Sequence, residues 1–124
     1  MILYIAGPMS GLPDNNRLAF LQAEDRLRAA GYSLIVNPAR NGLMPDAPWI
    51  AHMRADISNL VSTCDAVVTL PGVESSRGGA IETALARALD WPVKTLEEWI
   101  EMATTERNLR KKTADRSIKD AITT

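Results

Sequence analysis

Short apolar segments that alternate with stretches of helical periodicity constrain the fold of this chain more than any other feature. The four segments are residues 2–6, 34–36, 66–70 and 92–94, and each of the first three is followed by a turn that contains proline. Strands that alternate with helices form a parallel sheet with helices on both faces, joined by right-handed crossovers. The sequence therefore predicts a single-domain, three-layer α/β/α fold with a four- to five-stranded parallel sheet, doubly wound in the flavodoxin-like or Rossmann-like manner.

Residues that start and stop helices lie between the expected strands. Asp14 is a plausible N-cap for the first helix, which Gly31 ends. Pro48 opens the second helix, and the third begins near Ser76. The fourth helix begins at residues 95–98, where the sequence Thr-Leu-Glu-Glu matches a capping box.

Charge and apolar residues divide the chain into a body and a tail. We expect a domain over residues 1–103 and a charged tail over 104–124, helical or disordered, because apolar residues become sparse there. Residues 106–120 contain six basic and three acidic residues, whereas the remainder contains eight basic and twelve acidic residues. A mildly acidic body is a poor surface for nucleic acid, so nucleic acid is not expected as a partner, and any contact with it would fall to the tail.

Two features indicate the cellular location. The first expected strand begins directly after Met1, which leaves no room for a signal peptide, and no apolar run is long enough to cross a bilayer. Cys64 is the single cysteine, which excludes an internal disulfide and suits a reducing compartment. We therefore expect a cytoplasmic protein with no membrane partner.

The fold class selects a position for the site before any chemistry is considered. Ligands of open parallel sheets bind beyond the carboxyl ends of the strands, where the strand order reverses. If the first and third strands are neighbours, the loops 7–13 and 71–79 converge at that point. These are the two loops richest in glycine, proline and serine.

Glu82 is the most informative candidate at this edge. It lies near the start of the third helix, where the helix N-terminus favours an anionic carboxylate. Gly78 and Gly79 precede it by one turn and leave space beside it, and Leu85 and Ala86 offer it no cation one turn later. Such a carboxylate suits attack on an electrophilic carbon. The alternative is a helix glutamate that faces solvent.

Four other side chains have both a functional and a structural interpretation. Asp56 borders the apolar stripe of the second helix and has either a function or an ion-pair partner. Tyr4, in the first strand, is more often a core residue than a catalytic one. We prefer a surface position for His52, although it could pair with Asp56, and a core position for Trp49, although it could stack on a base.

The segment before Glu82 could hold a phosphate or sugar hydroxyls. Ser76 and Arg77 supply a hydroxyl and a cation, and Gly79 leaves backbone N–H groups accessible at the start of the helix. The structural alternative is an N-cap at Ser76 followed by a glycine-rich turn.

Several motifs that bind cofactors do not occur in the sequence. There is no G-x-x-x-x-G-K-[ST] and no G-x-G-x-x-G. The third strand ends without an aspartate, unlike a phospho-accepting receiver domain, and no paired Cys/His cluster suggests a metal site. We expect neither a cofactor nor a metal.

Read together, three segments resemble the nucleoside 2-deoxyribosyltransferase superfamily, most closely a short phage-associated branch. They are the opening Tyr-Ile-Ala-Gly-Pro at 4–8, Asp56 before an isoleucine, and Glu82 in Gly-Ala-Ile-Glu, and the resemblance covers about residues 1–94. It implies an enzyme that cleaves or transfers the N-glycosidic bond of a (deoxy)nucleoside or nucleoside monophosphate. It also implies a homo-oligomer, a dimer or larger.

The resemblance also implies roles for individual residues. Glu82 would be the nucleophile, Tyr4 would orient it, and Asp56 would contact the sugar and assist proton transfer. The loop of Gly7, Pro8 and Met9 would lie against the base or sugar.

One departure from the family pattern bears on the substrate. The family often has a second aspartate six residues before the glutamate, where this chain has Ser76. Loss of that acidic group favours a nucleotide over a free nucleoside. Two rival hypotheses remain: a non-catalytic module that binds or sequesters nucleotides, and an interaction protein that acts through its basic tail.

Overall fold

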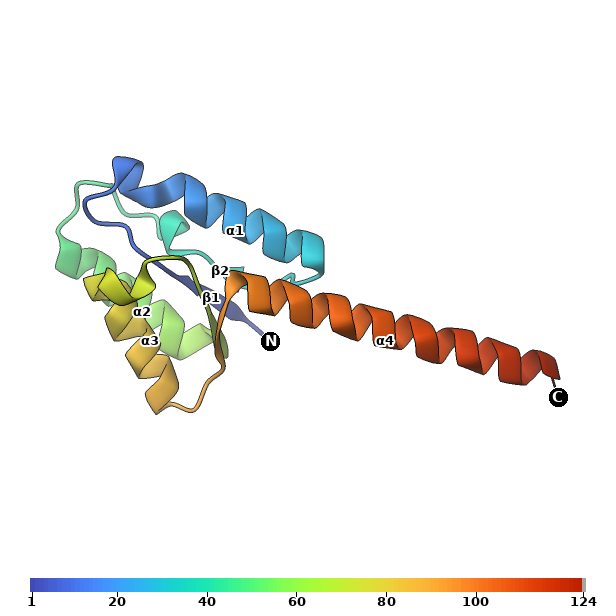
Figure 1. Cartoon of the computed structure of the whole chain (residues 1–124). Coiled ribbons are helices and arrows are strands. Elements are labelled where there is room, and N and C mark those ends of the chain that lie inside the picture. Colours follow the sequence, from blue (N-terminus) through green and yellow to red (C-terminus); the bar gives the residue numbers. More distant parts are fainter. Residues whose placement is uncertain (124) are drawn as a thin grey trace.

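The computed structural model describes residues 1–123, and a four-stranded parallel sheet lies at its centre (Figure 1). The strands are β1 (Leu3–Ala6), β2 (Ile35–Val36), β3 (Ala66–Thr69) and β4 (Val93–Thr95), in the order β2-β1-β3-β4. Every neighbouring pair is parallel. The doubly wound fold is therefore confirmed, and β1 lies beside β3 as expected.

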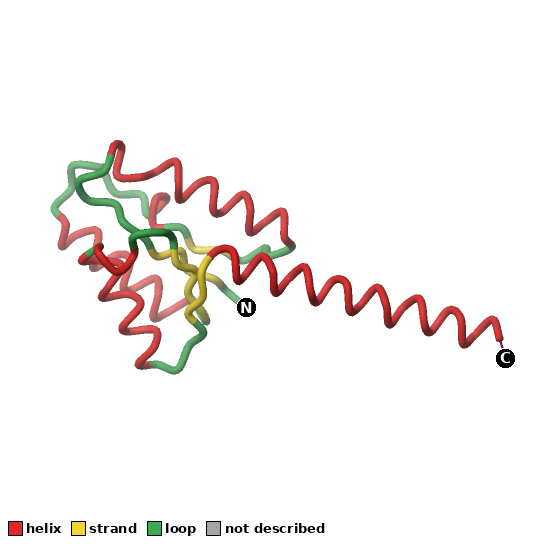
Figure 2. The backbone as a smooth tube through the Cα atoms, viewed as in Figure 1, coloured by secondary structure: helices red, strands yellow, loops and turns green. Residues whose placement is uncertain are grey.

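Helices cover both faces of the sheet and make up most of the chain (Figure 2). α1 (Arg17–Ala30) and α4 (Leu96–Thr123) pack on one face, and α2 (Trp49–Thr63) and α3 (Arg77–Ala88) pack on the other. No helix among the described residues is long and apolar enough to cross a membrane.

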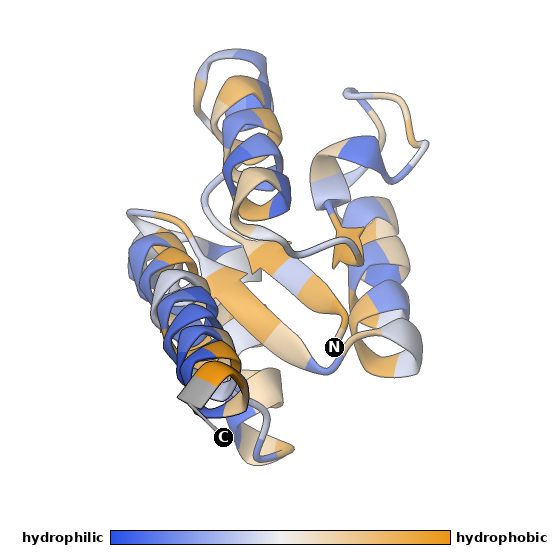
Figure 3. Cartoon of the chain, turned by 90° about the vertical axis from the view of Figure 1, so that its right-hand side faces the viewer, coloured by the Kyte–Doolittle hydropathy of each residue, from blue (hydrophilic) through white to orange (hydrophobic). Residues whose placement is uncertain are grey.

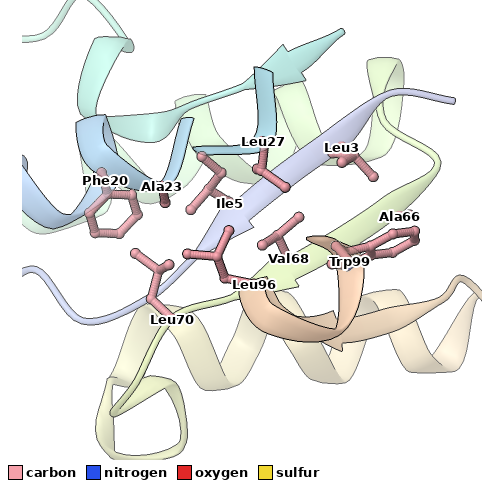
Figure 4. Close-up of a cluster of buried hydrophobic side chains, with 10 residues drawn as sticks. All are labelled: Leu3, Ile5, Phe20, Ala23, Leu27, Ala66, Val68, Leu70, Leu96 and Trp99. Carbon is pink, nitrogen blue, oxygen red and sulfur yellow. The ribbon is translucent and has the colours of Figure 1, made fainter. Parts of the chain in front are cut away.

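Side-chain alternation along the strands divides the core into two clusters. Leu3 and Ile5 of β1 face α1 and α4, where they pack with Phe20, Leu27 and other apolar side chains (Figure 4). Tyr4 belongs to the cluster on the opposite face, with residues of α2, β3 and α3. The period of two in β1 thus directs the Tyr4 side chain toward the layer that contains α3.

The start of α1 differs from the prediction. Asp14 is not its N-cap, because a 3₁₀ turn (η1, Pro13–Asn16) precedes the helix. Asp14, Asn15 and Asn16 have left-handed φ values of 49°, 51° and 59°, a conformation that aspartate and asparagine tolerate better than most residues. The Asn16 side chain donates to the carbonyl of Pro8 at 2.9 Å, which ties the turn to the loop after β1.

The fourth helix begins as predicted and continues further than the body. Thr95 N–H donates to Glu98 Oε1 at 2.9 Å, and Glu98 N–H donates to Thr95 Oγ1 at 3.1 Å, so the capping box is confirmed. The tail predicted over 104–124 is helical to Thr123, without a break at residue 103. Residue 124 lies outside the described part of the chain.

Candidate active site

A cavity of about 150 Å³ lies at the carboxyl edge of β1, between the loop that follows β1, the start of α3 and one face of α2. Six of the predicted site residues line it: Gly7, Met9, Asp56, Ser76, Gly79 and Glu82. The loop over residues 41–48 adds Pro45 and Ala47 to the wall. The sheet therefore brings together the loops that its topology indicated.

Glu82 and Tyr4 form a buried pair at the base of this cavity. Tyr4 is fully buried in β1, and its hydroxyl donates a hydrogen bond to Glu82 Oε2. Glu82 is 5% exposed although it lines the cavity, so the alternative of a solvent-facing helix residue is wrong.

Burial determines the charge of Glu82. It raises the pKa of the Glu82 carboxyl to about 8; the Tyr4 hydrogen bond lowers this pKa and the charge of Asp56 raises it, both by smaller amounts. With a pKa of about 8, roughly a tenth of the carboxyl groups are ionised at pH 7. Glu82 is thus mainly neutral at pH 7, whereas its place near a helix N-terminus suggested an anion.

The start of α3 explains how Glu82 reaches this position. Ser76 is the N-cap, and its Oγ accepts from the Gly79 N–H at 3.2 Å. A Cβ on Gly79 would lie 2.8 Å from Val73 Cγ2, and one on Gly78 would lie 3.0 Å from Met53 Sδ. The two glycines therefore let α3 approach its neighbours closely, and both line the cavity together with Glu82.

Asp56 is the second buried carboxyl of the cavity. It is 5% exposed, and it accepts a hydrogen bond at Oδ1 from Asn41 Nδ2 at 3.1 Å. It forms no ion pair with any described residue, so the structural alternative for this aspartate is wrong. Burial raises the pKa of Asp56, and the Asn41 hydrogen bond and nearby His52 oppose that shift.

Asn41 and His52 extend the network and hold the loop 41–48 at the wall of the cavity. Asn41 Nδ2 also lies 3.0 Å from His52 Nδ1, and His52 Nε2 lies 3.2 Å from the carbonyl of Met44. The two ring nitrogens of His52 therefore contact both the Asn41 amide and the backbone of the loop. His52 is half-buried in the cavity wall, and the preferred surface position was wrong.

The chain before Asn41 is anchored to α1 by a buried carboxylate. Glu24 Oε1 accepts from Asn37 Nδ2 and from Arg40 Nε, both at 3.0 Å. These hydrogen bonds hold the pKa of Glu24 below its usual value despite the cost of burial. The sequence did not indicate Asn41, because its segment has no periodicity and its partner Asp56 lies 15 residues further along the chain.

Two predicted substrate-binding residues lie outside the cavity. Pro8 lines a separate groove beside α1, on the other side of the loop after β1. The Arg77 guanidinium lies over the Trp49 ring, with Cζ 4.0 Å from the ring centroid, in a surface groove between α2 and α3. Consecutive side chains of a helix point about 100° apart. Because Gly78 and Gly79 face the cavity, the Arg77 side chain points away from it. Trp49 is half-buried rather than part of the core, and it lines both the cavity and the groove.

The wall of the cavity combines two acids with neutral groups. No lysine or arginine of residues 1–123 lines it, and its neutral polar residues include Ser10, Asn15 and Ser76. The described residues contain no group of three or more His, Cys, Asp or Glu side chains placed to hold a metal ion. Chemically, the arrangement offers one carboxyl for attack on carbon and a second for proton transfer.

Comparisons with curated proteins and with solved structures give no match. One family model matches residues 1–95, a range that includes the whole lining of the cavity and leaves all of α4 outside. The model's description is a domain of unknown function. The chain therefore belongs to the family DUF4406.

Proposed function

We propose that this protein cleaves or transfers the N-glycosidic bond of a nucleoside, with Glu82 as the nucleophile. The observation that carries the proposal is the pair of buried carboxyls, Glu82 and Asp56, in one cavity and with different partners. Two acids whose environments differ can take the roles of nucleophile and proton donor in glycoside chemistry. The resemblance to nucleoside 2-deoxyribosyltransferases assigns these roles to the same two residues.

The first step would form a covalent intermediate. Ionised Glu82 attacks the anomeric carbon, the N-glycosidic bond breaks, and its electron pair leaves with the base. Asp56, whose pKa is raised by burial, gives its proton to the departing base. The product is a glycosyl ester on Glu82 with Asp56 ionised.

The second step would release the sugar. Water or another base attacks the anomeric carbon, Asp56 accepts the proton of the attacking group, and the ester bond to Glu82 breaks. Tyr4 keeps the Glu82 carboxylate in place through both steps, and its hydrogen bond favours the ionised form. The charge of Asp56 raises the pKa of Glu82, so one proton stays on the pair up to about pH 8 and lies on Glu82 in the free protein. Attack therefore needs that proton to move to Asp56, which leaves Glu82 ionised and Asp56 able to protonate the departing base.

The wall of the cavity supports a nucleoside rather than a nucleotide as substrate. A 5′-phosphate brings up to two negative charges, and the described wall offers it two acids and no lysine or arginine. Arg77, the cation expected to meet a phosphate, lies against Trp49 instead. Trp49, Met9 and Met53 provide an apolar surface for a base.

A nucleoside-binding or sequestering module is the second candidate function. The raised pKa of Glu82 favours it, because a mainly neutral carboxyl at pH 7 is a poor nucleophile but a good hydrogen-bond donor. A binder would be stabilised thermally by nucleosides and would release no free base.

The test is a base-release assay with the full chain and labelled deoxynucleosides, ribonucleosides and their 5′-monophosphates, with and without an acceptor base. We expect base release from nucleosides, and a loss of about a thousandfold or more in Glu82→Gln. The matched control is Glu74→Gln, an exposed glutamate close to the start of α3, which should keep wild-type activity. Wild-type rates in Glu82→Gln would overturn the mechanism, and nucleoside binding without base release would establish the binding module.

A further inference from the structure

Two arginines lie beside the cavity without entering it. The groove between α2 and α3 is lined by Arg54 and Arg77, and it shares Trp49 and Met53 with the wall of the cavity. Six other basic residues lie on the exposed and mostly hydrophilic part of α4 (Figure 3), a helix that packs on the other face of the sheet. The groove arginines are therefore placed to act on the cavity wall from outside.

Arg77 has an aromatic partner rather than an acidic one. Its Cζ lies 4.0 Å from the centroid of the Trp49 ring, and it forms no ion pair with any other residue of the described chain 1–123. It is also the first residue of α3, where the helix N-terminus disfavours a cation. Neither charge pairing nor the helix explains an arginine at this position, whereas the contact with Trp49 does.

Trp49 presents one side to Arg77 and another to the cavity. The tryptophan lines both the groove and the cavity, whereas Arg77 lines only the groove. The guanidinium therefore covers the groove side of the ring and leaves the cavity side uncovered. An uncovered indole surface attracts flat aromatic ligands, because stacked and edge-on aromatic contacts are stabilising. The nucleobase is the flat aromatic part of the proposed substrate.

The Trp49 ring has no hydrogen bond that fixes its position. Within the described residues its Nε1 has no partner, whereas Nε1 of the buried Trp99 donates to the Val67 carbonyl at 3.0 Å. Trp49 is half-buried and begins α2 directly after the loop 41–48, where a side chain has room to change rotamer. The cation over its groove side is therefore the described polar interaction that holds the ring against the cavity.

We propose that Arg77 is a positioning residue for base recognition. Its guanidinium keeps Trp49 in the cavity wall, and the nucleobase packs against the uncovered side of that ring. The inference rests on the proposed function, and it names the base as the part of the substrate that this wall selects. Arg77 touches neither the substrate nor Glu82, so its loss should weaken binding and leave the chemical step unchanged.

Three variants of the full chain test this role. Arg77→Ala removes the cation, and Arg77→Lys keeps a cation without the planar guanidinium. Arg54→Ala is the matched control, because Arg54 is an exposed arginine of the same groove that makes no cation–π contact with Trp49. The two alanine variants have the same net charge, so the long-range effect of that charge is the same in both.

The first measurement is of kcat and KM for base release from deoxyadenosine and thymidine. In Arg77→Ala we expect KM to rise about fivefold, with kcat within about twofold of the wild type. Arg77→Lys should show a smaller rise in KM, and Arg54→Ala should match the wild type. A wild-type KM in Arg77→Ala, a loss of kcat alone, or an equal rise of KM in Arg54→Ala would each overturn the proposal.

Fluorine NMR of the chain labelled with 5-fluorotryptophan reports on the ring without any assay of activity. Trp49→Phe assigns the Trp49 resonance among those of the three tryptophans. In Arg77→Ala this resonance should move toward its position in the urea-unfolded chain, while those of Trp91 and Trp99 stay in place. In the wild type, deoxyadenosine should shift the Trp49 resonance. A Trp49 resonance that Arg77→Ala leaves unchanged would show that the arginine does not hold the ring.

The role of Arg77 and the proposed function fail in different ways. Base release with a KM that does not depend on Arg77 overturns only the role of Arg77. If nucleosides bind but are not cleaved, the dissociation constant for deoxyadenosine, titrated through the Trp49 resonance, replaces KM, and the same rise is expected in Arg77→Ala. A wild type that neither cleaves nor binds nucleosides overturns the proposed function and the base contact together.

Discussion

At the scale of single residues, Tyr4 controls how readily Glu82 ionises. The tyrosine is fully buried and its own pKa is well above the usual value, so it remains a hydrogen-bond donor across the working range of pH. Its hydrogen bond to Glu82 offsets part of the cost of burying a charge there. The nucleophile that we propose therefore depends on a hydroxyl that belongs to the core.

The proposed reaction needs one proton on the pair of Glu82 and Asp56, so base release should fall as pH rises through about 8, where the pair loses that proton. Tyr4→Phe removes an interaction that lowers the Glu82 pKa, so the midpoint of kcat/KM against pH should move upward, and kcat should fall by about 10- to 100-fold. The readout is the pH profile of base release. Tyr32→Phe, a control whose hydroxyl bonds to the Trp99 carbonyl, should keep the wild-type midpoint. An unchanged midpoint in Tyr4→Phe would contradict this role.

Stability should also depend on pH through Glu82, whether or not the protein is an enzyme. The folded pKa of about 8 exceeds the ordinary value of 4.5, so the folded state binds a proton that the unfolded state releases. The proton on Glu82 therefore stabilises the folded state fully below pH 4.5, and this stabilisation is lost as pH rises through about 8.

Glu82→Gln isolates that contribution. Between pH 5 and pH 9 the free energy of unfolding of the wild type should fall by a few kcal/mol more than that of the variant, on the order of 1.4 kcal/mol per unit of pKa difference. Urea unfolding at several pH values measures it, with Glu74→Gln expected to follow the wild type. Parallel curves for wild type and Glu82→Gln would show that the carboxyl is not buried as described.

The residue scale also shows the limit of reasoning from sequence alone. Glu82 and Asp56 were expected at the site, because a carboxylate near a helix start or beside an apolar stripe is visible in the order of residues. Tyr4 was expected there only from the family resemblance. Asn41 was not, because its bond to Asp56 depends on how an irregular loop folds back. Arg77 was expected in the cavity, and its direction was decided by the rotation of α3 that the glycines permit.

At the scale of elements, the loop 41–48 supplies part of the wall of the cavity through Pro45 and Ala47. Asn41 is its main attachment to α2, since its amide reaches both Asp56 and His52. Asn41→Ala should loosen the loop and leave the buried Asp56 without its hydrogen-bond donor. Hydrogen exchange of amides 42–47 should increase by about tenfold or more, and KM for a nucleoside should rise with it.

The control for this prediction is Asn59→Ala, an exposed asparagine on the same helix as Asp56, which should leave loop exchange unchanged. Equal protection of amides 42–47 in Asn41→Ala and wild type would mean that the loop is held by other contacts. A rise in exchange without a change in KM would separate the loop from substrate binding.

Helix starts and ends were predicted correctly where the residues that fix them are close together in the sequence. The capping box at Thr95 and Glu98 and the left-handed stop at Gly31 were both visible in the sequence and are confirmed. The start of α1 was misplaced, because three successive left-handed residues follow Pro13 and the Asn16 side chain bonds to the carbonyl of Pro8. Sequence spacing carries no information about that partner.

At the scale of the whole molecule, the alternation of strands and helices was sufficient to predict the layers, whereas the adjacency of β1 and β3 was a condition that the structure meets. The position of the cavity followed from that adjacency. The length of α4 could not be predicted from the sequence, because a charged segment with few apolar residues is compatible with either a helix or disorder.

Tyr4 and the loop 41–48 differ in how freely their positions can change during evolution. The hydroxyl that orients Glu82 comes from a central strand, fixed on both sides by pairing with β2 and β3. The loop 41–48 lies at the surface and is joined to α2 by a few side chains. Mutation can therefore reshape the entrance, and with it the range of molecules admitted, while the reacting carboxyl stays where the sheet puts it.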